Sequence, residues 1–216
     1  YHGTMEEYYL AMAGLFTPRW APQAVIWTDD PWGRRLAGES RIPVLTVGTD
    51  PDCDAVVGYG EDTPAGSTFS FRMGDQQHEV ATALAGRFNV ENAAVALACA
   101  HVQGWDLEES ARRLGDMSPI PGRYNTISND LGIWVVVDYA HTPDAISGVI
   151  DQTRALVTGR VIAIAGAGGD RDQEKRPLIG RALCSADVPI VTTDNPRSED
   201  PEAILDAIVA HVKQHL

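Results

Sequence analysis

The chain has few cysteines, and their placement excludes two kinds of scaffold. Among 216 residues there are three, Cys53, Cys99 and Cys184, which are odd in number and far apart in the sequence. No two of them form a CxxC pair, so neither a disulfide framework nor a cysteine zinc site is indicated. Reduced thiols of this kind are typical of the cytoplasm, which is the compartment we expect.

Long hydrophobic runs are also missing. No uninterrupted apolar segment approaches the roughly 18 residues that a membrane-spanning helix requires. Residues 1–8 lack the basic and apolar regions of a signal peptide. We therefore expect no insertion into a membrane. The chain does not begin with methionine, so we expect it to start inside a longer protein.

Basic residues are outnumbered by acidic ones. The 17 Lys and Arg residues against 30 Asp and Glu residues give a formal net charge of −13. Such a charge repels the phosphate backbone of nucleic acids and anionic lipid, so nucleic acid is not an expected partner. A bound nucleotide would need locally placed arginine, lysine or metal. An acidic surface that only keeps the protein in solution explains the same excess.

The first half of the chain mixes helical and strand patterns. Thr4 can cap a helix, with Glu7 three residues later, and Asn89 can cap a strongly apolar helix that follows it. The patterns predict helices over residues 4–16, 32–37, 90–103 and 107–114. They predict strands over residues 23–28, 42–47, 55–57, 68–73 and 77–84.

A proline-rich segment, residues 118–123, separates the two halves. Its two prolines remove backbone donors and restrict the residues before them, so no helix continues through it. We interpret the segment as a linker between a domain over residues 1–120 and a second domain over residues 121–216.

Strands and helices alternate in the second half. Short apolar runs predict strands over residues 133–137, 160–165 and 188–192, and continuous apolar runs are typical of parallel strands covered on both faces. Capped patterns predict helices over residues 145–156 and 203–215. This alternation implies right-handed crossovers. The predicted fold class is therefore α/β, with a doubly wound, Rossmann-like second domain.

Polar loops follow all three strands of that domain, at the sheet edge where ligands bind in such folds. In the first loop, residues 138–144, Asp138 could accept hydrogen bonds from ribose hydroxyls, and His141 could stack on or bond to a nucleotide. Asp138 could equally do no more than cap the following turn, which is the commoner role of an isolated aspartate.

The second loop is rich in glycine. Gly166, Gly168 and Gly169 allow a ligand to approach the backbone closely, and Arg171 stands beside two acids. The spacing is not that of the dinucleotide fingerprint, and no phosphate-binding P-loop occurs anywhere in the chain. Lys175 and Arg176 then open a helix, where cations oppose the helix dipole. Either a bound anion or a solvated helix face explains that placement.

The third loop, residues 193–201, combines acceptors, an amide and a guanidinium on a proline-stiffened scaffold. Arg197 can hold a carboxylate bidentately, while Asp194 and Asn195 can accept from an ammonium group. This combination suits a zwitterionic amino acid. A plain turn before a capped helix explains residues 198–201, but it does not explain Arg197 as naturally.

Seven strings, spread in order over nearly the whole chain, resemble those of the Mur ligase family. They are HGTMEEY at residues 2–8, DPWGR at 30–34, FNVEN at 88–92, PGR at 121–123, DYAHTPD at 138–144, GGDRD at 168–172 and DNPRSEDP at 194–201. The resemblance implies that residues 1–120 are the C-terminal part of a central ATPase domain. It implies that residues 121–216 are the Rossmann-like C-terminal domain, incomplete at its end.

The resemblance also implies a chemistry, ATP-dependent amide-bond formation in peptidoglycan precursor synthesis. ATP phosphorylates the D-glutamate carboxylate of UDP-MurNAc-L-Ala-D-Glu, and the amine of the incoming amino acid attacks the acyl phosphate, releasing ADP and phosphate. Magnesium and the positioning of the reactants are expected to supply most of the rate. The arginine in the last string points to meso-diaminopimelate, because relatives that add lysine have no second carboxylate to hold.

Site residues follow from the resemblance position by position. Asn92 is expected to meet the adenine with Asn89 nearby, Arg123 and Asp138 to contact ribose or phosphate, and His141 to lie beside the nucleotide. The residues expected to bind diaminopimelate are Arg171, Asp194, Asn195, Pro196 and Arg197.

The chain departs from the family pattern in two respects. It lacks the P-loop, and Met12 stands where relatives carry a carbamylated lysine that binds metal. A thioether is a poor magnesium ligand, so no metal residue is assigned, and the chain by itself is expected to be inactive. A non-catalytic module that binds an amino acid or a nucleotide is the alternative. A relative of folate-polyglutamate ligases is disfavoured by residues 194–201.

Overall fold

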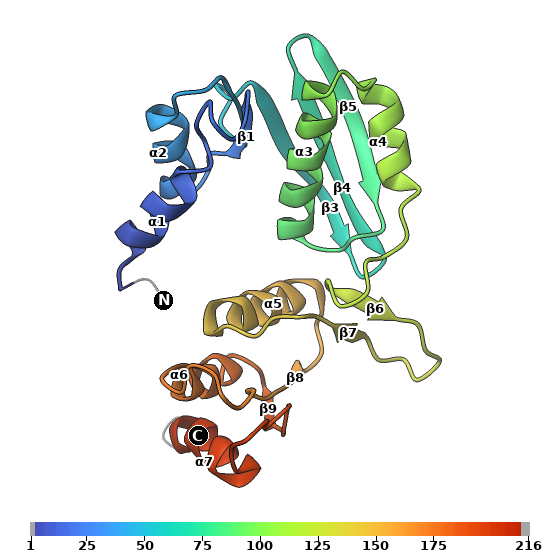
Figure 1. Cartoon of the computed structure of the whole chain (residues 1–216). Coiled ribbons are helices and arrows are strands. Elements are labelled where there is room, and N and C mark those ends of the chain that lie inside the picture. The colour runs from blue at the N-terminus through green and yellow to red at the C-terminus, as the bar shows by residue number, and fades with distance from the viewer. Residues whose placement is uncertain (1–2, 213–216) are drawn as a thin grey trace. The chain divides into compact units, whose positions relative to one another are not determined.

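A computed structural model describes residues 3–212 of the chain, which divides into two compact units (Figure 1). Unit 1 comprises residues 1–119 and unit 2 comprises residues 120–216. The boundary follows Pro119, inside the proline-rich segment. No helix within the described residues has the length and apolar character needed to cross a membrane.

Unit 1 is built on a five-stranded mixed sheet in the order β1-β2-β3-β4-β5. The first three strands run parallel, and β3, β4 and β5 form an antiparallel meander. The strands are β1 (Ala24–Trp27), β2 (Val44–Gly48), β3 (Ala55–Thr63), β4 (Gly66–Met73) and β5 (Gln76–Thr82). The helices are α1 (Met5–Ala13), α2 (Pro31–Glu39), α3 (Arg87–Val102) and α4 (Leu107–Gly115).

Capping hydrogen bonds fix where the first two helices of unit 1 begin. The Thr4 hydroxyl accepts from the Glu7 amide at 3.1 Å, as the sequence predicts for the start of α1. The Asp30 carboxylate accepts from the amides of Trp32 and Gly33, and Pro31 occupies the first turn of α2. These caps satisfy backbone donors that have no partner inside the helix.

The core of unit 1 lies between the sheet and helices α3 and α4. Phe69 and Phe71 on β4 are fully buried, and the small residues Ala94 and Ala98 bring α3 close to the strands. In Figure 1, α3 and α4 pack against one face of the sheet formed by β3, β4 and β5. Burial of these side chains explains why the strands alternate in exposure.

Two predictions for unit 1 were wrong in detail. Asn89 does not cap α3: the helix starts at Arg87, and Gly86, with φ of 103°, is its N-cap residue. A positive φ suits glycine, so the helix starts at the glycine and Asn89 lies in its first turn. Strand β3 also extends six residues beyond Val57, to Thr63, because hairpin pairing with β4 holds residues whose polar character hid the strand pattern.

Unit 2 contains helices that alternate with short strands. Its helices are α5 (Pro143–Leu156), α6 (Lys175–Leu183) and α7 (Pro201–Val212), and its strands are β6 (Asn125–Ile127), β7 (Val135–Val137), β8 (Ile162–Ala165) and β9 (Val188–Val191). Strands β8 and β9 are parallel, with Ile164 opposite Ile190. The predicted helix over residues 203–215 ends beyond the described residues.

The core of unit 2 joins its three helices to the β8–β9 pair. The buried side chains include Ile150 of α5, Leu183 of α6 and Ile208 of α7. Thr142 caps α5 by accepting from the Ala145 amide, with Pro143 in the first turn, as predicted. The α/β character of both units therefore agrees with the predicted fold class.

The strand pairing of unit 2 corrects two expectations. Strand β7 was expected in a parallel set, but it pairs antiparallel with β6, a strand that the sequence did not reveal. The β8–β9 pair is also not covered on both faces within the described residues, because Ile162 and Ile164 are 56% and 64% exposed. Continuous apolar runs therefore identified the strands but not the covering of their faces.

Candidate functional site

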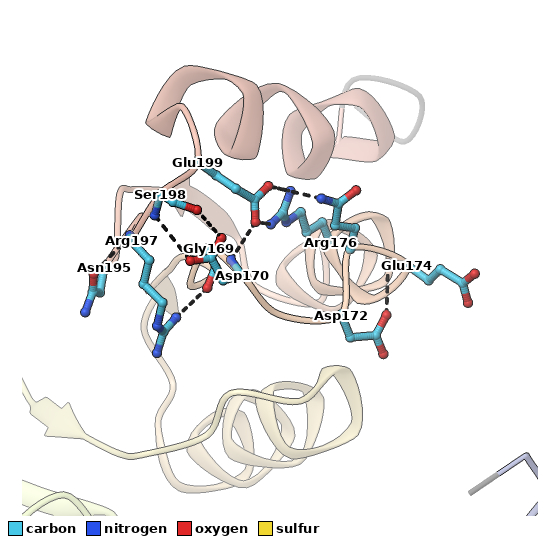
Figure 2. Close-up of polar contacts among 10 residues, drawn as sticks. Gly169, Asp170, Asp172, Glu174, Arg176, Asn195, Arg197, Ser198 and Glu199 are labelled. Carbon is cyan, nitrogen blue, oxygen red and sulfur yellow. Dashed lines mark hydrogen bonds and ion pairs between the residues drawn. The ribbon is translucent and has the colours of Figure 1, made fainter. Parts of the chain in front are cut away.

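Two loops at the carboxyl ends of β8 and β9 lie against each other. They carry the residues that the sequence predicts to bind an amino-acid substrate. We call residues 166–174 the β8 loop and residues 192–200 the β9 loop. The Gly169 amide donates to the Asn195 carbonyl oxygen at 2.9 Å, and the Thr192 amide donates to the Ala165 carbonyl oxygen at 3.1 Å. Because β8 and β9 are parallel, both loops lie at the same edge of this strand pair (Figure 2).

The glycines of the β8 loop are required by this contact between loops. A Cβ atom added at Gly169 would overlap the Pro196 carbonyl, and one added at Gly166 would overlap the Thr192 carbonyl oxygen. From the sequence, these glycines were expected to let a ligand approach the backbone closely. In the structure it is the neighbouring loop whose backbone comes close.

Arg197 has a strained backbone and a fixed side chain. Its φ is 50°, a left-handed conformation that costs a residue with a side chain roughly 1–2 kcal/mol. Its amide donates to Asn195 Oδ1 at 3.1 Å, and its Nη1 donates to the Gly169 carbonyl oxygen at 2.5 Å. These bonds hold the guanidinium over the β8 loop (Figure 2). Strain that is maintained in this way is common at binding sites.

Asp170 provides a second connection between the two loops. It also has a positive φ, of 51°. Its carboxylate accepts from the Ser198 hydroxyl at 2.6 Å, and its own amide donates to Glu199 Oε1 at 2.6 Å. Hydrogen bonds therefore cross between the loops in both directions.

Arg176 and Glu199 form an ion pair at the base of the two loops. The Arg176 side chain is 5% exposed and the Glu199 side chain 21% exposed, and their closest N–O distance is 2.7 Å. The guanidinium, with a smaller contribution from the Asp170 amide, lowers the pKa of Glu199 below its usual value. The bond to Glu199 likewise raises the pKa of Arg176. Neither a bound anion nor a solvated helix face, the two explanations offered for Arg176, describes this buried pair.

Sequence patterns did not reveal Glu199 and Asp170 as parts of the site. The available signal was Arg176 itself, a cation in the first turn of a helix, where its charge opposes the helix dipole. Such a placement is stable when a carboxylate lies beside it. The residue that supplies this carboxylate is 23 positions away along the chain, so spacing did not reveal it.

Four members of the set proposed to bind an amino acid are exposed: Arg171 in the β8 loop, and Asp194, Asn195 and Arg197 in the β9 loop. Arg171 follows Asp170, whose position is fixed by Ser198 and Glu199. The two loops that carry Arg171 and Arg197 therefore lie at the same edge of the β8–β9 pair, and a shared ligand there stays a prediction.

Asp138 serves the local backbone in unit 2. One carboxylate oxygen accepts from the Tyr124 amide and the other from the Ala140 amide, both at 2.7 Å. This is the turn-capping role that the sequence analysis weighed against a ribose contact. A carboxylate has about four lone-pair positions, so a further hydroxyl could still be accepted.

The other nucleotide candidates of unit 2 gather around an exposed tyrosine. Tyr139 is 68% exposed. The Arg123 guanidinium lies 5.6 Å from its ring centroid, and the His141 ring lies 5.4 Å from it in an edge-on arrangement. His141 Nδ1 also lies 3.1 Å from the Tyr139 carbonyl oxygen. The sequence analysis named Arg123 and His141 but not Tyr139.

The two candidate asparagines of unit 1 differ in their surroundings. Asn89 is buried, and its Nδ2 donates to the Ala85 carbonyl oxygen at 2.7 Å. Asn92, one helical turn later, is exposed. Burial fits Asn89 for holding the start of α3, and exposure leaves Asn92 accessible to a ligand.

A polar cluster that the sequence did not reveal adjoins these asparagines. The Tyr59 hydroxyl donates to Glu91 at 2.9 Å, and the Arg87 guanidinium lies 4.2 Å from the centre of the Tyr59 ring. Burial, followed by the neighbouring Glu91, raises the pKa of Tyr59 to about 12, while Arg87 opposes the shift. Tyr59 comes from β3, so no helical spacing connected it to α3.

The described residues do not provide a fit for magnesium. Within residues 3–212, no group of three or more His, Cys, Asp or Glu side chains could hold a metal ion. Met12, which the family resemblance aligned with a metal-binding lysine, is 41% exposed on α1. Its thioether is a poor ligand for a hard cation.

Two family descriptions match the chain. Residues 1–100 match the Mur ligase middle domain, and residues 122–215 match the Mur ligase glutamate ligase domain. Curated proteins named UDP-N-acetylmuramoyl-L-alanyl-D-glutamate–2,6-diaminopimelate ligase are similar: that of Gloeobacter violaceus is 42% identical over 98% of this chain and 44% of its own length. The protein of that name from Streptomyces coelicolor is 39% identical over 95% of this chain and 41% of its own length. The chain thus spans less than half the length of these relatives.

Solved structures agree with this similarity. A structure with the same ligase name is 37% identical, with a TM-score of 0.63, over 96% of this chain and 44% of its own. The folylpolyglutamate synthase of Thermotoga maritima has a TM-score of 0.71 at 20% identity, over 97% of this chain and 49% of its own. At that identity the likeness concerns the fold alone.

Proposed function

Because this chain belongs to the Mur ligase family, we propose that it forms the amino-acid-binding part of an ATP-dependent ligase that adds meso-diaminopimelate to UDP-MurNAc-L-Ala-D-Glu. The single observation that supports this substrate is the fixed Arg197 guanidinium beside the loop that carries Arg171. Two guanidinium groups at one edge suit an amino acid with two carboxylates. The products of the whole reaction would be the tripeptide precursor, ADP and phosphate, formed in the cytoplasm.

The proposed role of the chain's residues is binding and orientation. Arg197, with Arg171, would hold the carboxylates, while Asp194 and Asn195 would accept from an ammonium group and Pro196 would stiffen the loop. A free amine must reach the acyl carbon in line for amide formation, so fixing the carboxylates orients the nucleophile. Magnesium neutralises phosphate charge in such ligases, but the described residues do not form its site, so no step is assigned to it.

Nucleotide contacts are proposed separately for each unit. Asn92, with Asn89 behind it, would meet the adenine from unit 1. In unit 2, Arg123, Asp138 and His141 would contact ribose or phosphate. The exposure of Asn92, Arg123 and His141 is compatible with such contacts. ATP itself would need a phosphate cradle that this sequence does not contain.

A non-catalytic module that binds an amino acid or a nucleotide is the second candidate. Met12, at the position where the family resemblance implies a lysine, favours it. The two candidates differ in the turnover expected once the rest of a ligase is supplied. Fusion to the preceding domains of the Gloeobacter violaceus relative restores amide formation under the first candidate and yields no turnover under the second.

Isothermal titration calorimetry on the 216-residue chain tests the substrate. We expect meso-diaminopimelate to bind more tightly than L-lysine, and the Arg197→Lys variant to lose roughly tenfold in affinity for meso-diaminopimelate alone. Arg19→Lys is the matched control, because Arg19 lies over Trp20 in unit 1. Equal affinities for the two amino acids in the wild-type chain would reject the proposed substrate.

A further inference from the structure

The two proposed substrate arginines belong to different loops, so their spacing depends on what joins those loops. Arg171 stands in the β8 loop, whereas Arg197 stands in the β9 loop. The ladder between β8 and β9 ends at the pair Ala165–Val191, several residues before either arginine. Additional contacts must therefore hold the loops in register.

One carboxylate provides many of these contacts. Glu199 accepts four hydrogen bonds: two from the Arg176 guanidinium, one from the Asp170 amide and one from Gln173 Nε2. The three donor residues lie in the β8 loop or in the first turn of α6, and the acceptor lies in the β9 loop. Figure 2 shows the Glu199 side chain reaching between them.

A second set of hydrogen bonds, donated by the β9 loop to the β8 loop, also joins the two loops. Asp170 of the β8 loop accepts both the hydroxyl and the amide of Ser198, which precedes Glu199. The residue that follows Asp170 is Arg171, and the residue that precedes Ser198 is Arg197. Each end of the link is therefore one residue away from an arginine proposed to bind the substrate.

Charge and burial make Arg176 dependent on Glu199. The guanidinium is almost completely buried, and its Nε finds no hydrogen-bond acceptor within the part of the chain that the structure describes. A buried cation needs a carboxylate beside it, since water cannot compensate its charge. The pair therefore holds α6 and the β9 loop together whether or not a ligand is bound.

We propose that Arg176 and Glu199 are positioning residues that fix the spacing between Arg171 and Arg197 and thereby set selectivity for an amino acid with two carboxylates. This inference rests on the proposed function. Neither residue touches the substrate in this scheme. A site with one guanidinium on each of two joined loops rejects an amino acid whose second end is an amine, because one group then faces no carboxylate.

The experiment uses the 216-residue chain and the variants Glu199→Gln, Arg176→Lys and the double variant. Glu199→Gln keeps the shape but removes the charge, and Arg176→Lys keeps the charge but removes the two-pronged bond. The matched control is Arg154→Lys, which alters the ion pair of Arg154 with Asp187 in the same unit, at 3.1 Å. Circular dichroism verifies that each variant is folded.

The first measurement is hydrogen exchange of the Asp170 and Ser198 amides, which requires no ligand. We expect exchange at both amides to become about tenfold faster in Glu199→Gln and to stay unchanged in the control. Unchanged exchange at Asp170 in both single variants would overturn the proposed link.

The second measurement is the ratio of calorimetric affinities for meso-diaminopimelate and L-lysine. We expect the ratio to fall about tenfold in either single variant, and the double variant to fall no further, because coupled residues are not additive. An unchanged ratio with faster exchange overturns the selectivity role. If the wild-type chain binds no meso-diaminopimelate, the proposed function and the selectivity role both fail, and exchange alone decides whether the pair joins the loops.

Discussion

The α-carbon of Gly169 lies so close to the Pro196 carbonyl that a side chain cannot fit between them. We therefore expect Gly169→Ala to separate the β8 and β9 loops, to lower the unfolding temperature and to weaken meso-diaminopimelate binding. Gly148→Ala is the control, because nothing lies within 4 Å of its Cβ position on α5. That change should raise stability by roughly 0.5–1 kcal/mol. Thermal unfolding that is the same for both variants would contradict the close contact.

Substitution of the two asparagines of α3 should have different effects, one on stability and the other on ligand binding. Asn89→Ala removes a buried donor to the Ala85 carbonyl, so we expect a loss of about 1–3 kcal/mol in urea unfolding. Asn92→Ala changes an exposed side chain and should leave stability within about 0.5 kcal/mol of wild type. If Asn92 meets adenine as proposed, its variant alone should lower ATP affinity in calorimetry. A loss of ATP affinity in Asn89→Ala and a loss of stability in Asn92→Ala would contradict both assignments.

Acid should weaken unit 2 partly through Glu199. Its pKa in the folded chain is lowered below the ordinary value of 4.5 by Arg176. A depressed folded-state pKa means that the stabilisation is present above pH 4.5 and is lost as the pH falls through the folded value. Glu199→Gln should therefore be less stable than wild type at pH 7, with the difference shrinking below pH 4.5. Urea unfolding at several pH values measures this difference, and a constant gap would refute the ionic contribution.

Alkali should weaken unit 1 through Tyr59. Burial raises its pKa in the folded chain from 10 to about 12. Because the folded-state pKa is the higher one, its stabilisation is complete below pH 10 and is lost as the pH rises toward 12. We expect Tyr59→Phe to flatten the loss of stability between those values. An alkaline slope that is the same in Tyr59→Phe and in the wild-type chain would contradict this contribution.

Much of the local structure could be predicted from residues that are close in sequence. The caps at Thr4 and Thr142 act over three residues, and apolar runs identified β8 and β9 within two residues at each end. Polar stretches were less informative: the far half of β3 is held by pairing with β4, not by its own apolar pattern. Prediction therefore failed where a strand depends on its partner.

The proposed site shows the same division. The family resemblance indicated Arg171 and Arg197 as candidates, and Arg197 also stood out because turn formation does not explain its guanidinium. The sequence did not indicate that Glu199 pairs with Arg176 or that Tyr59 reaches Glu91. Both pairs join residues more than 20 positions apart, and only packing of the elements brings them together.

The sequence by itself determined where α1 and α5 begin, that β8 and β9 are strands and which loops are polar, because capping bonds and apolar runs act within a few residues. The tertiary structure decided that Arg176 is a buried ion-pair residue, and that the backbone of the β9 loop packs closely against the glycines of the β8 loop. Those outcomes depend on the register of two parallel strands and on the exclusion of water between their loops. Neither condition exists until the chain has folded.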